Sequence, residues 1–366
     1  MRLLCCLLPT LWLVACAEDE AAPIDGALPD GPVIDVGPDA APPVDAAADG
    51  SPDAALDMAP DAEIDAAADA APDAEVDAEP GWRFPPRETC GGRYASPVEL
   101  SELGDPGVVE ASGLTASPSR PDVLWLHNDS GDGPMLYAVG TNGTPRARLV
   151  LPVQAVDWED LAAAACPDRS GPCLWVADVG DNLLTRDVVY VYAVPEPQAD
   201  GFGMADRIWR FPLRYPDGPV DSEALAVAPD GSTFWLFEKV DGPEARIFQS
   251  PAPLIDGRRA TAVEVGRFNS PGVAVQFGRM VTGAALHPKG NRLLIRVYTG
   301  TFEYRFGPDQ GVADIGAIEP TLVAFGPISE PQGEAVAYSA TGRDVLTVSE
   351  DPDREPGQPV HAYLCQ

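Results

Sequence analysis

Acidic side chains recur at comparable places along the last 280 or so residues of the chain, and together they could hold a cation. One set of glutamates opens runs of small residues, and a second set of acids and amides closes runs rich in Leu, Val and Trp. Carboxylate and amide oxygens suit a hard cation such as Ca²⁺, which takes about six to eight of them. The candidate metal ligands are Asn128, Asp129, Asp157, Glu159, Asp178, Glu223, Glu238, Glu334 and Glu350.

Three interpretations of these residues stay open. Crowded carboxylates raise one another's pKa unless a cation lies among them, which favours a calcium site. The same side chains could instead line a polar ligand or substrate site without metal, or only cap strands by accepting hydrogen bonds from turn amides. Residues 128–133 half-match a calcium loop, but Val139 stands where its closing Glu would be. Asp160, Asp181, Asp221 and Asp351 flank the set.

The elements that must position these acids repeat along the chain. Each repeat has a run of small residues, a tight turn and a strand, and successive strand ends lie 50, 60, 60 and 52 residues apart. This period without helix predicts an all-β fold, a single β-propeller with four-stranded blades. In a propeller the starts of the first strands and the ends of the second strands surround one mouth of the central channel. The acids should therefore gather there, in an asymmetric ring, because Gly283 and Tyr298 of the fourth repeat are not acidic.

We expect five blades, with six as the alternative. The fifth repeat stops at its third strand, so its missing rim strand should be residues 94–100, and an N-terminal strand would close the last blade. The unassigned run Val273 to Phe277 leaves room for a degenerate sixth blade at 271–281. Trp125, Trp175 and Trp235 recur at one blade position, which favours packing between blades over stacking on a sugar.

Four of the seven cysteines should form two disulfides. Cys166 and Cys173 flank a turn-rich loop, and Cys90 and Cys365 stand at the two ends of the predicted propeller, which meet in such a fold. Closing the longer loop would stabilise the protein by about 4 to 5 kcal/mol in the chain-entropy model. A site of four thiolates for zinc lacks the paired C-x-x-C spacing.

The N-terminus has the pattern of a targeting signal. Residues 1–15 combine Arg2 with an apolar stretch too short to span a membrane. Leu13 to Cys16 resembles a bacterial lipoprotein signal. This resemblance implies an exported protein whose one membrane attachment is lipid on Cys16, and Ala17 after the cysteine implies the outer membrane. An ordinary secretory signal cut near Ala15 or Ala17 is the alternative.

Charge divides the rest of the chain. Residues 17–80 contain 19 acids and no Lys or Arg, so we expect residues 16–80 to be a disordered linker after the lipidated cysteine and residues 81–366 to form the propeller. From Gly81 onward 38 acids face 23 basic residues, which disfavours nucleic acid as a partner. We expect a monomer whose partner is an unidentified protein, glycan or small molecule.

With these motifs assembled, residues 105–350 resemble secreted bacterial β-propellers of the WD40-like or NHL-like kind. The matching stretches are residues 110–114, 127–131, 157–160, 177–182, 221–225, 298–300 and 332–335. Residues 334–337 followed by 348–350 are similar, more distantly, to phytase-like or esterase-like propellers. That resemblance implies carboxylates that hold Ca²⁺ and basic residues that bind phosphate, for which the chain offers Lys239, Arg279, Lys289 and Arg296.

We therefore expect an envelope-tethered binding or scaffold module with a divalent-cation site at the mouth of its channel. One alternative is a calcium-dependent hydrolase of phosphate or carboxyl esters, whose metal would polarise the substrate and activate water. Another is a purely structural envelope lipoprotein. The sequence leaves open whether the protein is an enzyme. His127 does not make a catalytic triad with Asp129 and Ser130 together, because these two adjacent residues point to opposite faces of an extended chain.

Overall fold

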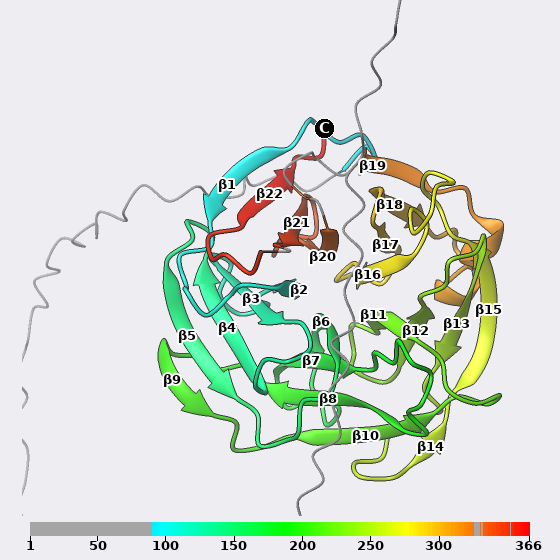
Figure 1. Cartoon of the computed structure of the whole chain (residues 1–366), viewed down its shortest axis with the longest axis horizontal. Coiled ribbons are helices and arrows are strands. Elements are labelled where there is room, and N and C mark those ends of the chain that lie inside the picture. The colour runs from blue at the N-terminus through cyan, green and yellow to red at the C-terminus, as the bar shows by residue number, and fades with distance from the viewer. Residues whose placement is uncertain (1–89, 326–329, 331, 352) are drawn as a thin grey trace, which may run out of the picture. The chain divides into compact units, whose positions relative to one another are not determined.

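The folded part of the chain is a closed ring of five β-sheets around one axis (Figure 1). A computed structural model describes residues 90–325, 330, 332–351 and 353–366. It confirms the predicted all-β fold class and the five-bladed propeller. The signal sequence (1–15), Cys16 and the acidic linker (16–80) lie outside the described residues, so these assignments stay predictions.

Every blade is built from four antiparallel strands in chain order, except that the last blade borrows its fourth strand from the N-terminal side. Blade one contains β2 (Ala111–Ala116), β3 (Val123–Asn128), β4 (Met135–Gly140) and β5 (Pro145–Val150). Blade two contains β6 (Trp158–Ala165), β7 (Pro172–Asp178), β8 (Val189–Pro195) and β10 (Trp209–Arg214). Blade three contains β11 (Ser222–Val227), β12 (Phe234–Glu238), β13 (Glu244–Gln249) and β15 (Val263–Asn269). Blade four contains β16 (Val281–Leu286), β17 (Arg292–Val297), β18 (Gly300–Arg305) and β19 (Thr321–Phe325). Blade five contains β20 (Gln332–Tyr338), β21 (Val345–Glu350), β22 (Pro359–Tyr363) and β1 (Val98–Glu102).

The ring closes as predicted, through the two ends of the folded region. Strand β1 pairs antiparallel with β22, and Tyr94 forms an isolated bridge with Cys365 (Figure 1). The Cys90–Cys365 disulfide joins the same two segments across a sequence separation of 275. The second predicted disulfide, Cys166–Cys173, is also present.

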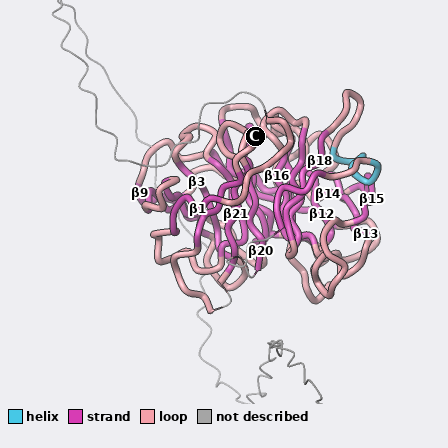
Figure 2. Tube along the Cα trace, turned by 90° about the horizontal axis from the view of Figure 1, so that it is seen from above, coloured by secondary structure: helices cyan, strands magenta, loops and turns pink. Residues whose placement is uncertain are grey.

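Three features depart from the simple repeat. Two short strands extend the rims of blades one and two: β9 (Gly201–Met204) runs parallel to β5, and β14 (Ala260–Thr261) runs parallel to β10. A 3₁₀ helix, η1 (Val312–Ala317), packs beside β15 and is the helical segment seen in Figure 2. Both added strands are short, with four and two residues, and each pairs on one edge only.

The sixth blade considered as an alternative is not formed. Residues 273–277 lie in turns between β15 and β16, where Val273, Val275 and Phe277 are exposed. No helix within the described ranges is both long and apolar enough to cross a membrane.

The hydrophobic core consists of five clusters, each shared by two neighbouring blades. Trp125 and Trp175 are fully buried, and Trp175 stacks on Phe211 with 5.7 Å between the ring centroids. Burial of aromatic side chains is a large part of what holds sheets face to face. Trp125 and Trp175 belong to clusters shared by two blades, and Trp175 also lies 6.3 Å from Phe234 of blade three, which confirms their predicted packing between blades; Trp235 is half-buried.

Each first strand carries a β-bulge at the equivalent place, close to its start. A bulge sets two residues against one on the partner strand and re-aims a side chain. The five bulged residues are Ser112, Glu159, Glu223, Thr282 and Glu334. In blade four the equivalent of the glutamates is therefore Thr282, and not Gly283 as the sequence alignment of the repeats suggested.

Candidate functional site: the acidic mouth

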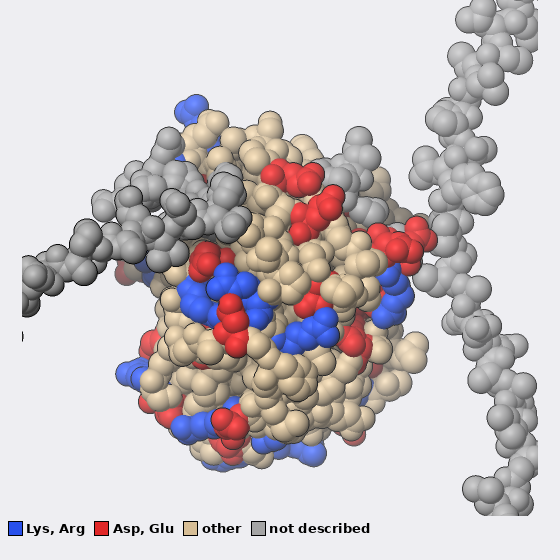
Figure 3. All heavy atoms as spheres, turned by 90° about the vertical axis from the view of Figure 1, so that its left-hand side faces the viewer, with Lys and Arg blue, Asp and Glu red and all other residues tan. Residues whose placement is uncertain are grey.

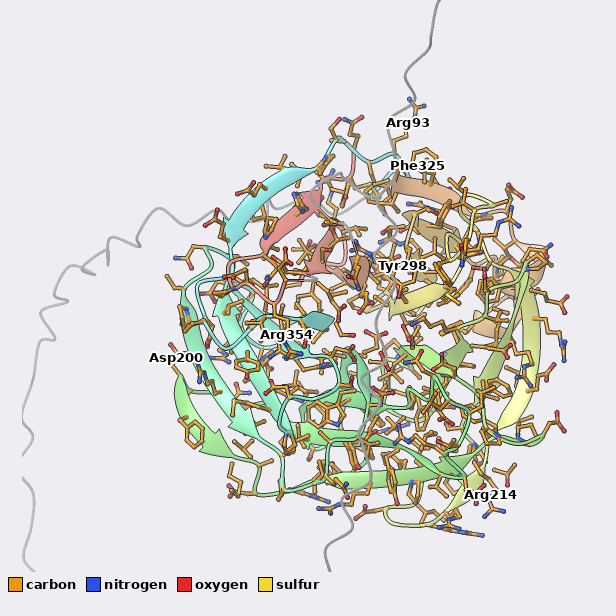
Figure 4. All side chains as sticks on the ribbon, in the orientation of Figure 1. Arg93, Asp200, Arg214, Tyr298, Phe325 and Arg354 are labelled. Atoms are coloured by element: carbon orange, nitrogen blue, oxygen red, sulfur yellow. A yellow bond between two sulfur atoms is a disulfide. The ribbon has the colours of Figure 1, made fainter. Side chains whose placement is uncertain are left out.

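Carboxyl groups from several blades gather where the first strands begin and the second strands end. We call the following eight side chains the acidic mouth: Asp129, Asp157, Glu159, Glu223, Lys239, Tyr298, Glu334 and Glu350. Figure 4 shows Tyr298 toward the middle of the ring, whereas Arg93, Asp200 and Arg214 lie at its periphery. The fold thus brings together acids that are more than 200 residues apart in the chain, since Asp129 and Glu350 interact.

Three of these carboxyls form a compact triad. One oxygen each from Asp129, Asp157 and Glu159 lies within 4.8 Å of the others. Asp129 follows β3, Asp157 precedes β6, and Glu159 is the bulged residue of β6. Gly180 leaves room for this approach, because a Cβ there would overlap Glu159 Oε1 and come within 2.5 Å of Asp157 Oδ2.

The triad is electrostatically unfavourable without a cation. Burial, followed by the charge of Asp129, raises the pKa of Asp157 to about 6. Burial and then the charge of Glu223 raise the pKa of Glu159 well above its ordinary value. Asp129 Oδ1 is buried and has no hydrogen-bond partner among the residues that the structure describes. A hard cation would satisfy these oxygens, because charge and donor type both match.

Glu223 has a cationic partner within the protein. Lys239, directly after β12, forms an ion pair with Glu223, and its Nζ lies 5.7 Å from the ring centroid of Tyr298. Burial by itself would lower the pKa of Lys239, but the charge of Glu223, together with Tyr298 and the hydrogen bond to Glu223, outweighs burial and raises it. Lys239 therefore carries a positive charge, which is used in the ion pair with Glu223.

Glu334 and Glu350 form a second pair of carboxyls. Glu350 Oε2 accepts a hydrogen bond from Gln332 Nε2 at 3.2 Å, and the Tyr298 hydroxyl lies 3.4 Å from Glu334 Oε1. Burial and then Asp129 raise the pKa of Glu350 to about 8. Burial and then Glu350 raise the pKa of Glu334 well above its ordinary value. The pair consequently retains a proton near neutral pH.

Three predicted ligands instead use their oxygens within the protein. Asn128 accepts hydrogen bonds from the Val109 and Glu110 amides at 3.0 and 3.1 Å. Asp178 pairs with Arg186 at 2.6 Å, and Glu238 accepts a hydrogen bond from Arg246 Nε of β13 at 2.9 Å. A metal role for Asn128, Asp178 and Glu238 stays a prediction, and none of the three belongs to the triad.

Asp160, expected as a flanking acid of the mouth, has a different place. It is fully buried, and its carboxylate accepts hydrogen bonds from the amides of Leu161 at 2.8 Å, Leu225 at 2.7 Å and Ala284 at 3.1 Å. These amides belong to three different blades, so Asp160 joins first strands near the axis. One sequence signal could have revealed this role: an aspartate directly before the apolar run of β6.

The basic residues proposed for phosphate binding have other partners or other places, and Arg279 Nε donates a hydrogen bond to the Gly272 carbonyl at 3.4 Å. Besides Lys239, Arg296 is buried in an ion pair with Glu330 at 2.5 Å, and Lys289 lies in the turn between β16 and β17, at the opposite ends of the strands. The side of the molecule that carries β5 and β9 mixes both signs of charge, for example in the Arg146–Asp200 pair at 2.7 Å (Figure 3). Such a surface lacks the single-sign field that attracts a polyanion.

A cavity of about 480 Å³ lies at the far ends of the first strands, away from the acidic mouth. Its walls include Ala116, Ala163, Val227 and Ala337, together with the polar side chains of Arg169, His287 and Tyr338. The cavity holds no cluster of titratable side chains like that of the mouth. The chemistry of the described region is therefore concentrated at the mouth.

Comparison with known proteins gives no family. No family model matches the chain, and no curated protein matches it. Similar solved structures include the PQQ-bound aldose sugar dehydrogenase from Streptomyces coelicolor, at 11% identity over 75% of this chain and 99% of that chain, with a TM-score of 0.41. Hydrazine synthase from Kuenenia stuttgartiensis is 14% identical over 71% of this chain and 96% of that chain, with a TM-score of 0.37. At these values neither similarity supports a statement about function.

Proposed function

We propose that the protein is a binding module whose acidic mouth holds a divalent cation, with Ca²⁺ as the best match. The observation that carries this proposal is the convergence of Asp129, Asp157 and Glu159 within 4.8 Å. Glu223 forms an ion pair with Lys239, and Asp178 forms one with Arg186. A cation that neutralises the triad would have to come from solution. Ca²⁺ accepts carboxylate oxygens in a flexible geometry and would keep positions open for water or for a ligand.

Attachment to the envelope is part of this proposal and is supported by the sequence pattern around Cys16. A lipid on that cysteine and the acidic linker would hold the propeller at the surface of the outer membrane. Metabolic labelling with a radioactive fatty acid tests this: label should enter the wild-type protein and be absent from Cys16→Ser. Label retained in Cys16→Ser would contradict the lipoprotein assignment.

A second candidate function is a cation-dependent hydrolase, which the Glu334–Glu350 pair favours. Two buried carboxyls that retain one proton can act as general acid and general base. A cation on the triad would polarise the bond to be cleaved. Carboxyl esters fit this site better than phosphate esters, because the mouth has a single lysine and that lysine is paired with Glu223.

The proposal is tested by calorimetric calcium titration of the oxidised mature protein after treatment with a chelator. We expect binding in the micromolar range and a higher melting temperature with calcium. Asp157→Asn should weaken binding about tenfold or more, because one carboxylate ligand of the triad is lost. Asp309→Asn, an exposed acid in the loop after β18, is the matched control and should bind like wild type.

The outcome separates the two candidate functions. No heat and no thermal shift would contradict the cation site and leave the acids as strand caps. Calcium-dependent turnover of p-nitrophenyl esters that disappears in Glu334→Gln would identify a hydrolase. Calcium binding without turnover would support the binding module and argue against the hydrolase.

A further inference from the structure

The cavity at the far ends of the first strands is separate from the acidic mouth. All five first strands contribute to its wall, and Figure 1 shows these strands (β2, β6, β11, β16 and β20) innermost in the ring. Its volume of about 480 Å³ lies within the range of ligand pockets, roughly 300–1,000 Å³. An apolar cavity of roughly 150 Å³ takes up benzene, so this cavity has room for a molecule about three times that size.

Asp160 lies between the cavity and the acidic mouth. Its carboxylate accepts hydrogen bonds from the amides of Leu225 in β11 and Ala284 in β16, which draws three first strands together near the axis. The wall of the cavity begins directly beyond this level, at Leu161 in β6 and at Ala285 in β16. None of the eight side chains of the acidic mouth lines the cavity, so a ligand would enter from the opposite face.

Small apolar side chains of the wall are accessible although they lie on the innermost strands. Ala162, Ala163 and Ala165 of β6 are half-buried, and so are Ala285 and Leu286 of β16. Their apolar groups are therefore open to a ligand. Larger side chains at the alanine positions would fill the space between the strands, so the run of alanines in β6 keeps the cavity open.

The entrance of the cavity is built from turns that contain proline. Pro118, Pro229 and Pro288 follow the first strands of blades one, three and four, and all three are exposed. Pro172 opens β7 of blade two at the same end. Because proline has a fixed φ, these turns lose little conformational freedom when a ligand binds, and the entrance is preorganised.

Two hydroxyl groups of the wall donate to carboxylates inside the protein. Ser117 Oγ donates to the buried Glu196, and the Tyr338 hydroxyl donates to Glu303 at 2.9 Å. Thr115 adds a neutral hydroxyl to the wall. These hydroxyl groups therefore offer a ligand few hydrogen bonds.

The two basic side chains of the wall do not favour an ion. His287 Nδ1 accepts a hydrogen bond from the Lys289 amide at 3.0 Å, and burial, followed by the charge of Arg292, lowers the pKa of His287 to about 4. The imidazole is therefore neutral at pH 7. Arg169, at the exposed edge, is paired with Asp230 at 3.0 Å. An ion in the cavity would lose its hydration without gaining a counter-charge, which is costly.

We propose that this cavity binds a neutral apolar molecule, about three times the size of benzene, against the alanine-rich ends of the first strands. Burial of the ligand's apolar surface would supply the binding free energy. This inference does not rest on the cation site, because it uses no side chain of the acidic mouth, so either proposal can fail without the other.

The test compares two fluorescent probes that share one ring system on the oxidised mature protein. N-phenyl-1-naphthylamine is neutral, whereas 8-anilinonaphthalene-1-sulfonate carries an additional sulfonate group. The neutral probe should bind once per propeller, in the micromolar range, and about tenfold or more tightly than the sulfonate. Equal or tighter binding of the sulfonate, or no saturable binding of the neutral probe, would overturn the proposal.

Two variants locate the probe. Ala163→Leu and Ala285→Leu add bulk to the wall from blades two and four, and each should weaken the neutral probe about tenfold, because the added carbon atoms take the space of the ligand. Ala317→Leu, at the exposed end of η1, is the matched control and should bind like wild type. Unchanged affinity in both wall variants would overturn the proposal. Melting curves verify that the variants fold, and the comparison of the two probes decides if they do not.

The acidic mouth supplies the second control. Saturating calcium and Asp157→Asn should each leave the affinity for the neutral probe within about twofold, because the two sites share no side chain. Leu183→Ser, in a loop where Leu183 is 83% exposed, should also bind like wild type. A loss in Leu183→Ser with unchanged affinity in the wall variants would place the probe on exposed loops and overturn the proposal.

Discussion

Three of the five bulged residues are glutamates, and their negative charges are compensated to different extents. Glu223 has Lys239, and Glu334 has a proton retained with Glu350. Glu159 is surrounded by Asp129, Asp157 and further carboxyls, all of which raise its pKa. Identical backbone positions therefore have different chemistry, and Glu159 is the one that gains most from an external cation.

Glu159→Gln should change the stability of the protein in opposite directions with and without calcium. In chelator the variant should be more stable by about 1 kcal/mol or more, because a buried and uncompensated carboxylate is removed. With saturating calcium the order should reverse, since the wild type gains more binding free energy. Melting curves under both conditions measure this difference. A variant that is less stable than wild type in chelator would show that Glu159 is already compensated within the protein.

At the scale of elements, Asp160 connects β6, β11 and β16 through hydrogen bonds to three backbone amides. Asp160→Ala would leave these buried donors without acceptors, at a cost of roughly 1–3 kcal/mol each. Asp160→Asn keeps one carbonyl oxygen and should lose less than the alanine variant. Urea unfolding of both variants measures the difference. Equal losses would mean that the amides are satisfied in another way.

The joint between blades four and five depends on a buried ion pair. Arg296 of β17 pairs with Glu330, which also accepts hydrogen bonds from Thr347 and contacts His361. Burial by itself would raise the pKa of Glu330, but Arg296, His361 and Thr347 outweigh burial and lower it to about 2. The carboxylate thus contributes stability that is present above its ordinary pKa of 4.5 and is lost as the pH falls toward 2.

Glu330→Gln should remove this dependence on pH. At pH 7 it should cost about 3–5 kcal/mol, because it leaves Arg296 buried without its counterion, and the cost should shrink as the pH falls from 4.5 toward 2. Urea unfolding at several pH values measures the free energy of unfolding of both proteins. Asp309→Asn serves as the surface control. A cost that stays constant down to pH 2 would contradict the assigned pKa shift.

At the scale of the whole molecule, the ring is closed by β1 on β22 and by the Cys90–Cys365 disulfide. Cys365→Ser should destabilise the protein by about 4 to 5 kcal/mol, because the disulfide spans 275 residues and restricts the unfolded chain strongly. Cys166→Ser opens a separation of only 7 residues and should cost less, about 2 to 3 kcal/mol. Unfolding in urea under non-reducing conditions compares the two. A larger loss for Cys166→Ser would show that local packing, and not ring closure, dominates.

Much of the architecture could be predicted before any coordinates. The repeat of strands and turns indicated five blades, and the missing fourth strand of the last repeat indicated closure near Tyr94 and the disulfide of Cys90 with Cys365. These features follow from local sequence patterns and from the need of the last blade for a fourth strand that completes its sheet. The gathering of acids at one edge was predictable for the same reason, because equivalent positions of all blades surround one axis.

Only the tertiary structure decided which of those acids form ion pairs, which retain a proton and which stay open to a cation. In the sequence, Asp178 and Glu238 are acids at strand boundaries, as Glu159 is. In the structure, however, each of the two forms an ion pair with an arginine from a neighbouring segment. The bulges that aim Glu159, Glu223 and Glu334 inward arise from pairing registers, which one strand by itself does not contain. Whether a carboxylate is paired, protonated or open to a cation is set by neighbours and burial, and residues far apart in the chain supply both.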